Sequence, residues 1–135
     1  MAKLLLVEDD ALLIRLYQKK FAKDGHEVVS AKDGEEGLVA IEREQPDLVL
    51  LDIMMPKLSG LEMLERIKAN PATRAVPVVM LSNMSGEEEQ EKALELGAVA
   101  YIVKSNSNPS HVAAKVREIL AASTRDKELP SAVSL

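Results

Sequence analysis

The chain has 135 residues, a formal net charge of −5 and no cysteine. Its length suits a single domain, and 47% hydrophobic residues with only 2% aromatic ones predict an aliphatic core rather than a disordered chain. The acidic charge and the scarcity of aromatic rings argue against nucleic-acid binding by this chain, and without cysteine it forms neither disulfides nor Cys-based zinc sites.

The first half of the chain alternates apolar runs with amphipathic segments. The runs at residues 4–7 and 47–51 predict strands that are covered on both faces, as in a parallel sheet, and residues 26–30 predict a more polar strand nearer an edge. Helices are expected at about residues 11–23 and 35–44, where apolar residues recur at helical spacing. The residues expected to face the core from these helices are Leu13, Leu16, Tyr17, Phe21, Leu38 and Ile41.

The second half continues this alternation. Strands are expected at residues 76–81 and 100–103, and helices at about residues 61–68 and 87–97. The glutamates at the start of the later helix are interpreted as a solvated first turn, where the helix dipole favours negative charge. A last helix begins at Pro109, and its expected inner face is formed by Val112, Val116, Ile119 and Leu120.

Five strands that alternate with five helices predict an α/β domain, in which right-handed crossovers join a parallel sheet with helices on both faces. The domain is expected to span residues 1–122. From Ser123 the apolar pattern is lost, so residues 123–135 are interpreted as a tail or the start of a linker. The N-terminal apolar run ends in acids too early for a signal peptide, and no stretch approaches membrane-spanning length, so a cytoplasmic location is expected.

The residues that follow the strands carry the chemistry. They are Glu8 and Asp9 after the first strand, Asp52 after the third, Ser82 after the fourth and Lys104 after the fifth. In a parallel sheet these ends meet at one edge, where three carboxylates would repel one another and favour a hard cation such as Mg²⁺. Lys104 supplies a counter-charge for an anion beside the metal, and Ser82 can donate to the same anion. Because a carboxylate can attack phosphorus, the set predicts phosphoryl transfer onto Asp52.

Over about residues 3–121 the chain resembles the receiver domains of two-component response regulators. The matching features are the acidic pair Glu8-Asp9, the turn Asp33-Gly34, the phosphoacceptor segment at residues 52–56, a switch hydroxyl at Ser82, a switch aromatic at Tyr101 and the lysine Lys104. The resemblance implies a CheY-like, flavodoxin-like doubly wound fold with strand order 2-1-3-4-5. It also implies a Mg²⁺ site formed by Asp9, Asp52 and the backbone carbonyl of Met54, with Glu8 helping through a water molecule.

The resemblance further implies how the domain would work. A sensor histidine kinase or a histidine phosphotransfer protein would donate the phosphoryl group. Ser82 and Tyr101 would then couple the phosphoryl group to a surface formed by the fourth helix, the fifth strand and the fifth helix. That surface is also a candidate homodimer interface, whereas the output partner is not readable from the sequence. On this interpretation the chain is a phosphorelay switch, without direct nucleic-acid or membrane contact, that catalyses only its own phosphorylation and dephosphorylation.

Two features need separate expectations. Ser105 stands where the family usually has a proline that is joined to the lysine by a cis bond. Because a cis bond before a non-proline residue costs roughly 2.5–4 kcal/mol, a trans Lys104–Ser105 bond is expected. Met54 and Met84 each lie two residues beyond a key position, Asp52 and Ser82. Neither thioether can orient an attacking water, so slow self-hydrolysis of the phosphoryl group is expected.

Two other functions compete with this interpretation. A degenerate receiver would act as a phosphorylation-independent docking module, an alternative that Ser105 keeps open. A phosphatase with an aspartyl-phosphate intermediate would need a second acid two residues after the nucleophile. This chain has Met54 at that position, which argues against such an enzyme.

Overall fold

The computed structural model describes residues 2–55, 57–83, 86–104 and 108–128, with residues 123–128 as backbone only. Within these residues the chain forms a five-stranded parallel sheet in the order β2-β1-β3-β4-β5, which confirms the predicted α/β fold and strand order. The strands are β1 (Lys3–Val7), β2 (Glu27–Ala31), β3 (Leu48–Leu51), β4 (Val78–Ser82) and β5 (Ala100–Val103). The polar strand β2 lies at an edge, as its composition predicts.

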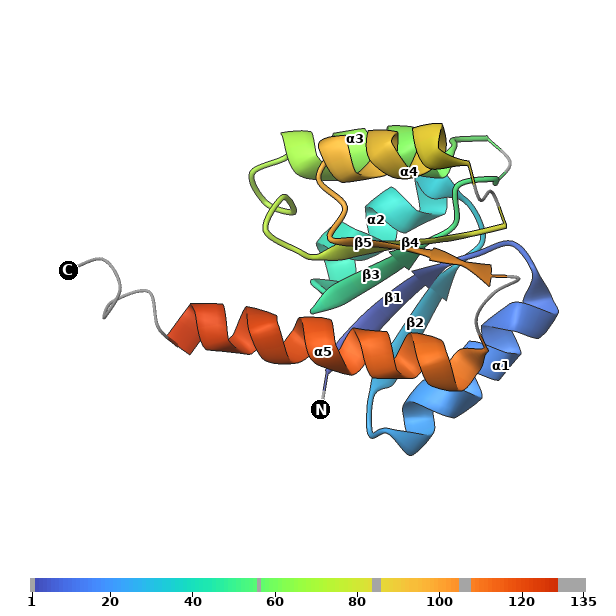
Figure 1. The fold of residues 1–135 in the computed structure, drawn as a ribbon, viewed down its shortest axis with the longest axis vertical. Coiled ribbons are helices and arrows are strands. Elements are labelled where there is room, and N and C mark those ends of the chain that lie inside the picture. The colour runs from blue at the N-terminus through green and yellow to red at the C-terminus, as the bar shows by residue number, and fades with distance from the viewer. Residues whose placement is uncertain (1, 56, 84–85, 105–107, 129–135) are drawn as a thin grey trace.

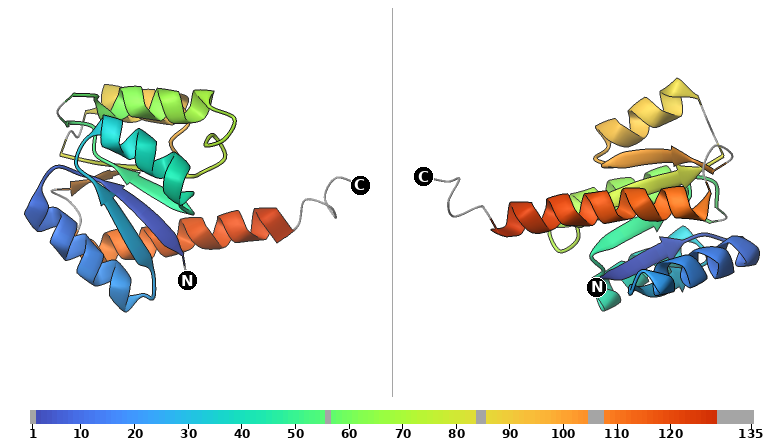
Figure 2. Two further views of the ribbon diagram at one scale, coloured as in Figure 1. Left: turned by 180° about the vertical axis from the view of Figure 1, so that it is seen from behind. Right: turned by 60° about the horizontal axis from the view of Figure 1, so that its bottom comes forward.

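Helices cover both faces of the sheet (Figure 1). On one face lie α1 (Ala11–Lys23) and α5 (Pro109–Glu128), and on the other lie α2 (Gly34–Glu44), α3 (Gly60–Ala69) and α4 (Glu87–Glu95). Figure 2 shows the same two layers from behind and from below. In the described part of the chain, no helix combines the length and the apolar character that a membrane span requires.

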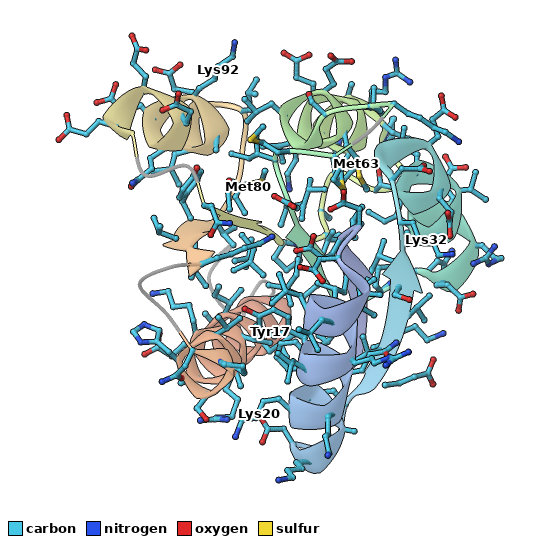
Figure 3. All side chains as sticks on the ribbon, turned by 90° about the vertical axis from the view of Figure 1, so that its right-hand side faces the viewer. Tyr17, Lys20, Lys32, Met63, Met80 and Lys92 are labelled. Carbon is cyan, nitrogen blue, oxygen red and sulfur yellow. The ribbon has the colours of Figure 1, made fainter. Side chains whose placement is uncertain are left out.

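The sheet buries an aliphatic core on each side, because the side chains of a strand alternate between its faces. Leu5 of β1 packs in the layer beneath α2 and α3, whereas Leu4 packs in the layer toward α1 and α5. Figure 3 shows Met63 and Met80 in the first layer and Tyr17 between α1 and α5. Every residue of β3 is buried, as the unbroken apolar run before Asp52 predicts.

Leu16 corrects the predicted inner face of α1. The helical spacing places it in the core, but 44% of it is exposed. The helix is held to the core by Tyr17 and Phe21, which are both buried and lie one turn apart. Leu16 lies about 100° around the helix axis from Tyr17, away from this stripe, which places it on the helix flank. The other residues expected to face inward are buried or packed against the core: Leu13, Tyr17, Phe21, Leu38, Ile41, Val112, Val116, Ile119 and Leu120.

The last helix is longer than the apolar pattern predicts. The sequence predicts a tail from Ser123, but α5 continues to Glu128. The sequence from Ser110 to Glu128 contains neither glycine nor proline, so the backbone can stay helical after the apolar stripe has ended. The helix therefore continues beyond the point where amphipathic periodicity is lost in the sequence.

Candidate phosphorylation site

The carboxyl ends of the strands surround a pocket of about 230 Å³. Its lining residues are Glu8, Asp9, Asp10, Leu13, Asp52, Met54, Ser82, Asn83 and Lys104. All the acids that the strand ends predicted lie here together with Ser82 and Lys104. The parallel topology explains the gathering, because it brings the ends of β1, β3, β4 and β5 to one edge of the sheet.

Asp52 is held in a fixed position at the floor of this pocket. It directly follows β3, is only 6% exposed, and its backbone N–H donates to the carbonyl oxygen of Val7 at 3.1 Å. Its Oδ1 accepts a hydrogen bond from the Met54 N–H at 3.2 Å, and its Oδ2 accepts one from Lys104 Nζ at 3.1 Å. Both carboxylate oxygens are therefore oriented, which compensates the cost of burying the charge.

Gly60 allows α3 to begin close to this carboxylate. A Cβ atom at position 60 would lie 2.1 Å from the backbone oxygen of Asp52 and 2.7 Å from the Cα of Ile53. The N–H of Gly60 also donates to the carbonyl oxygen of Ile53 at 2.8 Å. The segment that carries Asp52 is thus packed directly against the first turn of α3, and only glycine leaves room for this contact.

Glu8 and Lys104 form the charged centre of the pocket. Glu8 is 1% exposed, and its Oε2 accepts hydrogen bonds from the N–H groups of Asp9 and Asp10 at 3.0 and 3.2 Å. Its Oε1 pairs with Lys104 Nζ, which also reaches Asp52. Lys104 therefore bridges the acid after β1 and the acid after β3. Asp9 itself is exposed, and Asp10 caps α1 by accepting from the N–H of Leu12 at 2.9 Å.

The pKa values of Glu8 and Lys104 reflect both their burial and the charges around them. Burial raises the pKa of Glu8 to about 7, with the negative charge of Asp52 adding to the rise and the hydrogen bond from Lys104 opposing it. Burial alone would lower the pKa of Lys104, but its contacts with Glu8 and Asp52 outweigh burial, so this pKa lies above its ordinary value. One ammonium thus contacts two carboxyl groups while Asp9 and Asp10 also line the pocket, and the pocket favours a further positive charge.

The donor set fits a small divalent cation. Glu8, Asp9 and Asp52 each offer a carboxylate oxygen, and these oxygens lie within 4.8 Å of one another. Clustered carboxylate oxygens on a partly open pocket are the ligands that Mg²⁺ prefers. The structure thus brings together the three acids that the sequence predicted as metal ligands or their helpers.

Ser82 and Tyr101 also lie together. Ser82 is the last residue of β4 and is 1% exposed, and Tyr101 lies on the neighbouring strand β5 and is half-buried. Burial raises the pKa of Tyr101, and a side-chain hydrogen bond with Ser82 opposes this rise. Ser82 lines the pocket and Tyr101 packs against the core beneath α3 and α4, so the pair connects the pocket with the α4 side of the molecule.

Some predictions fall outside the described residues. The structure does not describe Pro56, Met84 or Ser105. The expected trans Lys104–Ser105 bond and the expected contribution of Met84 therefore stay predictions. Sequence reasoning did not assign Asp10 and Asn83 to the pocket that they line, and it missed the roles of Gly60 and Leu13 at the site. Gly60 stood only as a loop residue before a helix, and Leu13 as a core residue, although it lines the pocket. Neither carries a sequence signal for these contacts, because both depend on where a helix packs.

Comparison with known proteins gives the same picture over most of the chain. The family model described as "Response regulator receiver domain" matches residues 4–117. Over 118 residues the chain is 39% identical to the probable transcriptional regulator ycf27 of Porphyridium aerugineum. It is 38% identical over 118 residues to the alkaline phosphatase synthesis transcriptional regulatory protein PhoP of Bacillus subtilis. Each match covers 87% of this chain and 48% of the relative, so the chain spans about half the length of these proteins.

A solved structure gives the same result for the fold. The crystal structure of a response regulator receiver domain protein (CheY-like) from Methanospirillum hungatei has a TM-score of 0.85 and 31% sequence identity to this chain. The match covers 93% of this chain and 98% of that one. The whole patterned part of the sequence therefore has a counterpart in a single solved domain.

Proposed function

The chain belongs to the response regulator receiver domain family, and from this premise we propose that Asp52 accepts a phosphoryl group from a phosphohistidine donor. The observation that carries the proposal is the position of Asp52, a buried carboxylate at a strand end with both oxygens oriented by Met54 and Lys104. The donor would be a sensor histidine kinase or a histidine phosphotransfer protein. Receiver domains are signalling modules, and the only chemistry proposed for this one is its own phosphorylation and dephosphorylation.

The chemistry needs a nucleophile, a counter-charge and a hydrogen-bond donor, and the chain supplies each. A carboxylate oxygen of Asp52 attacks phosphorus, the P–N bond to the donor histidine breaks, and a P–O bond to Asp52 forms. Lys104 exchanges its contact with Asp52 for one with a phosphoryl oxygen, since its Nζ already lies 3.1 Å from the attacking group. The Ser82 hydroxyl, which lines the same pocket, donates to another phosphoryl oxygen.

We further propose that Asp9, Asp52 and the backbone carbonyl of Met54 hold a Mg²⁺ ion, with Glu8 acting through a water molecule. The closeness of the three carboxylate oxygens supports this assignment. When bound, such an ion neutralises charge on the carboxylates and on the phosphoryl oxygens. The chain's own residues then orient the nucleophile and leave an open side for the donor.

The output step is proposed for the surface formed by α4, β5 and α5. Movement of Ser82 toward the phosphoryl group would release its contact with Tyr101 and let the tyrosine ring shift. Such a shift biases a pre-existing equilibrium of the surrounding elements. The contact between these two side chains supports this coupling, and the same surface is the proposed site of a homodimer or an output partner.

The proposed function is tested by incubating the protein with Mg²⁺ and a small acyl phosphate and measuring its intact mass. Wild type should gain one phosphoryl group, and Asp52→Asn should gain none. Asp47→Asn is the matched control, because Asp47 lies at the opposite end of β3, where its carboxylate accepts from the Lys3 N–H at 2.8 Å. Uptake by Asp52→Asn would refute the assignment, and absence of uptake in wild type would favour the docking-module alternative.

The persistence of the phosphoryl group is a separate proposal. Met54 places a thioether beside the pocket where a polar side chain would be needed to orient an attacking water. We therefore propose that the phosphoryl group is lost slowly by self-hydrolysis. Its lifetime is measured by intact mass after the acyl phosphate has been removed. A lifetime of only seconds would contradict the proposal.

A further inference from the structure

Met54 differs from the other methionines that the structure describes in both exposure and place. It is 67% exposed and lines the pocket that holds Asp52. Met63 and Met80 are 0% exposed in the core, and Met55 packs against the same core cluster. A dissolved oxidant therefore reaches the Met54 sulfur more readily than the sulfur atoms of the other three.

We propose that Met54 is a peroxide-sensitive modification site, and that its oxidation to the sulfoxide shortens the lifetime of the phosphoryl group on Asp52. This inference rests on the function proposed for Asp52 and adds a chemical input to the same pocket. The phosphorylated domain would then report two conditions at once, the activity of its donor and the oxidant level around it.

The modification is a two-electron oxidation of a thioether by hydrogen peroxide. A lone pair of the sulfur attacks one peroxide oxygen, and the O–O bond breaks. The proton of the transferred oxygen passes to the departing hydroxide, so the products are the sulfoxide and water. The step is reversible in cells, because methionine sulfoxide reductases return the sulfoxide to the thioether. Oxidation of Met54 can therefore act as a reversible switch and not only as damage.

The backbone of Met54 keeps the new oxygen near the reaction centre. Its N–H donates to Asp52 Oδ1 at 3.2 Å, and this bond does not involve the sulfur. Met54 lines the pocket, and most of its surface is open to solvent. Oxidation thus changes the polarity of the rim while the backbone that orients Asp52 stays the same.

The sulfoxide oxygen is a good hydrogen-bond acceptor, whereas the thioether is a weak one. It can hold a water molecule on the open side of the pocket, facing the phosphorus. In hydrolysis the water oxygen bonds to phosphorus, the bond to Asp52 breaks, and Asp52 returns as a carboxylate while inorganic phosphate leaves. A water that is already oriented meets a lower barrier, so the lifetime shortens.

The modification itself is tested by treating the folded protein with increasing hydrogen peroxide and mapping the added oxygen by peptide mass. Met54 should gain one oxygen before Met63 and Met80, which should react only after unfolding in urea. Equal reaction of Met63 or Met80 in the folded protein would overturn the assignment of Met54 as the sensitive site.

The consequence is tested by loading Asp52 with a small acyl phosphate and Mg²⁺, removing the donor, and following phosphoryl loss by intact mass before and after peroxide. Wild type should lose its phosphoryl group at least about threefold faster after oxidation, because a positioned acceptor assists the water. Met54→Leu has no sulfur, so its lifetime should be the same before and after peroxide. Met54→Gln places an amide oxygen at the rim and should shorten the lifetime without peroxide.

The outcomes separate this inference from the proposed function. Normal phosphoryl uptake with an unchanged lifetime after complete oxidation of Met54 would overturn the inference alone. Equal shortening in Met54→Leu would also overturn it, because another residue would then be responsible. No uptake by untreated wild type would instead overturn the proposed function, and the control of lifetime by oxidation would fall with it. Circular dichroism of each variant checks that the fold is retained.

Discussion

Glu8 should make the unfolding free energy of the domain depend on pH. Its pKa in the folded chain is about 7, above the ordinary value of 4.5, because burial and the charge of Asp52 outweigh the hydrogen bond from Lys104. Between these values the folded state holds a proton that the unfolded state has lost, so stability falls as the pH rises through this window. We expect the unfolding free energy in urea, without divalent metal, to drop by about 1–3 kcal/mol from pH 5 to pH 8.

The control for this prediction is Glu8→Gln, which keeps the shape of the side chain but cannot titrate. Its unfolding free energy should lack the drop between these two pH values. The same pH dependence in the variant and in wild type would assign the effect to another group.

Gly60 should tolerate no side chain. In Gly60→Ala the new Cβ would lie 2.1 Å from the Asp52 backbone oxygen, so α3 or the Asp52 segment must move. We expect a loss of about 2–3 kcal/mol of unfolding free energy, measured in urea, and reduced phosphoryl uptake because the nucleophile is displaced. Gly25→Ala is the matched control: Gly25 has φ +85°, but a Cβ at this position would meet nothing within 4 Å. It should cost only about 1 kcal/mol and leave uptake intact.

At the scale of single residues, the sequence predicted that the acids and the lysine belong to the site, because they follow short apolar runs that predict strands. It could not predict that Gly60 touches Asp52 or that Leu16 is exposed. Both depend on the position and rotation of a helix on the sheet, which a single helix's periodicity leaves open by part of a turn. Residue identity was therefore more predictable than residue contact.

At the scale of elements, α2 is followed by a strained cap residue. Gln45 has φ 47° and ψ 61°, and its N–H donates to the carbonyl oxygen of Ile41 at 3.1 Å. This left-handed region costs a residue with a Cβ about 1–2 kcal/mol, whereas glycine adopts it at a smaller cost, in conformational entropy. We expect Gln45→Gly to raise the unfolding free energy by about 0.5–1 kcal/mol, measured in urea. Gln45→Ala retains a Cβ and should bring no gain, so equal effects of the two changes would argue against strain.

The elements themselves were largely predictable, for different reasons in strands and in helices. Strands such as β3 are short apolar runs, and little else fits such a run in an α/β chain. The start of α2 follows Asp33, whose carboxylate accepts from the Glu36 N–H at 2.9 Å. The end of α5 was not predictable from periodicity, because helix continuation needs only the absence of a breaking residue.

At the scale of the whole molecule, the parallel topology concentrates negative charge at one edge of the sheet. A bound divalent cation should therefore stabilise the folded state, which alone brings the acids together. We expect Mg²⁺ at about ten times its Kd to raise the unfolding free energy by about 1.4 kcal/mol, measured by thermal unfolding with and without the ion. Asp9→Asn should lose most of this gain and Asp47→Asn should keep it. A full gain in Asp9→Asn would remove Asp9 from the ligand set.

The composition of the pocket was predictable at this scale because topology alone decides which strand ends meet. The contacts among the charged side chains were not predictable, because they depend on a competition among charges. Lys104 forms ion pairs with both Glu8 and Asp52. The sequence does not show whether Lys104 makes these ion pairs or extends into solvent. The alternation of strands and helices thus predicts the fold, whereas the network of charged contacts is visible only in the three-dimensional structure.

Because α5 is long, a small tilt of the helix at its first turn would displace its C-terminal end by a larger distance. The helix has 20 residues, and its C-terminal end projects beyond the strands of the sheet (Figure 1). A helix of this size is about 30 Å long, so a tilt of roughly 10° at its first turn would move its last turn by about 5 Å. A small adjustment at the pocket edge of the sheet would in this way become a displacement comparable to a full helical turn at the far end of the molecule.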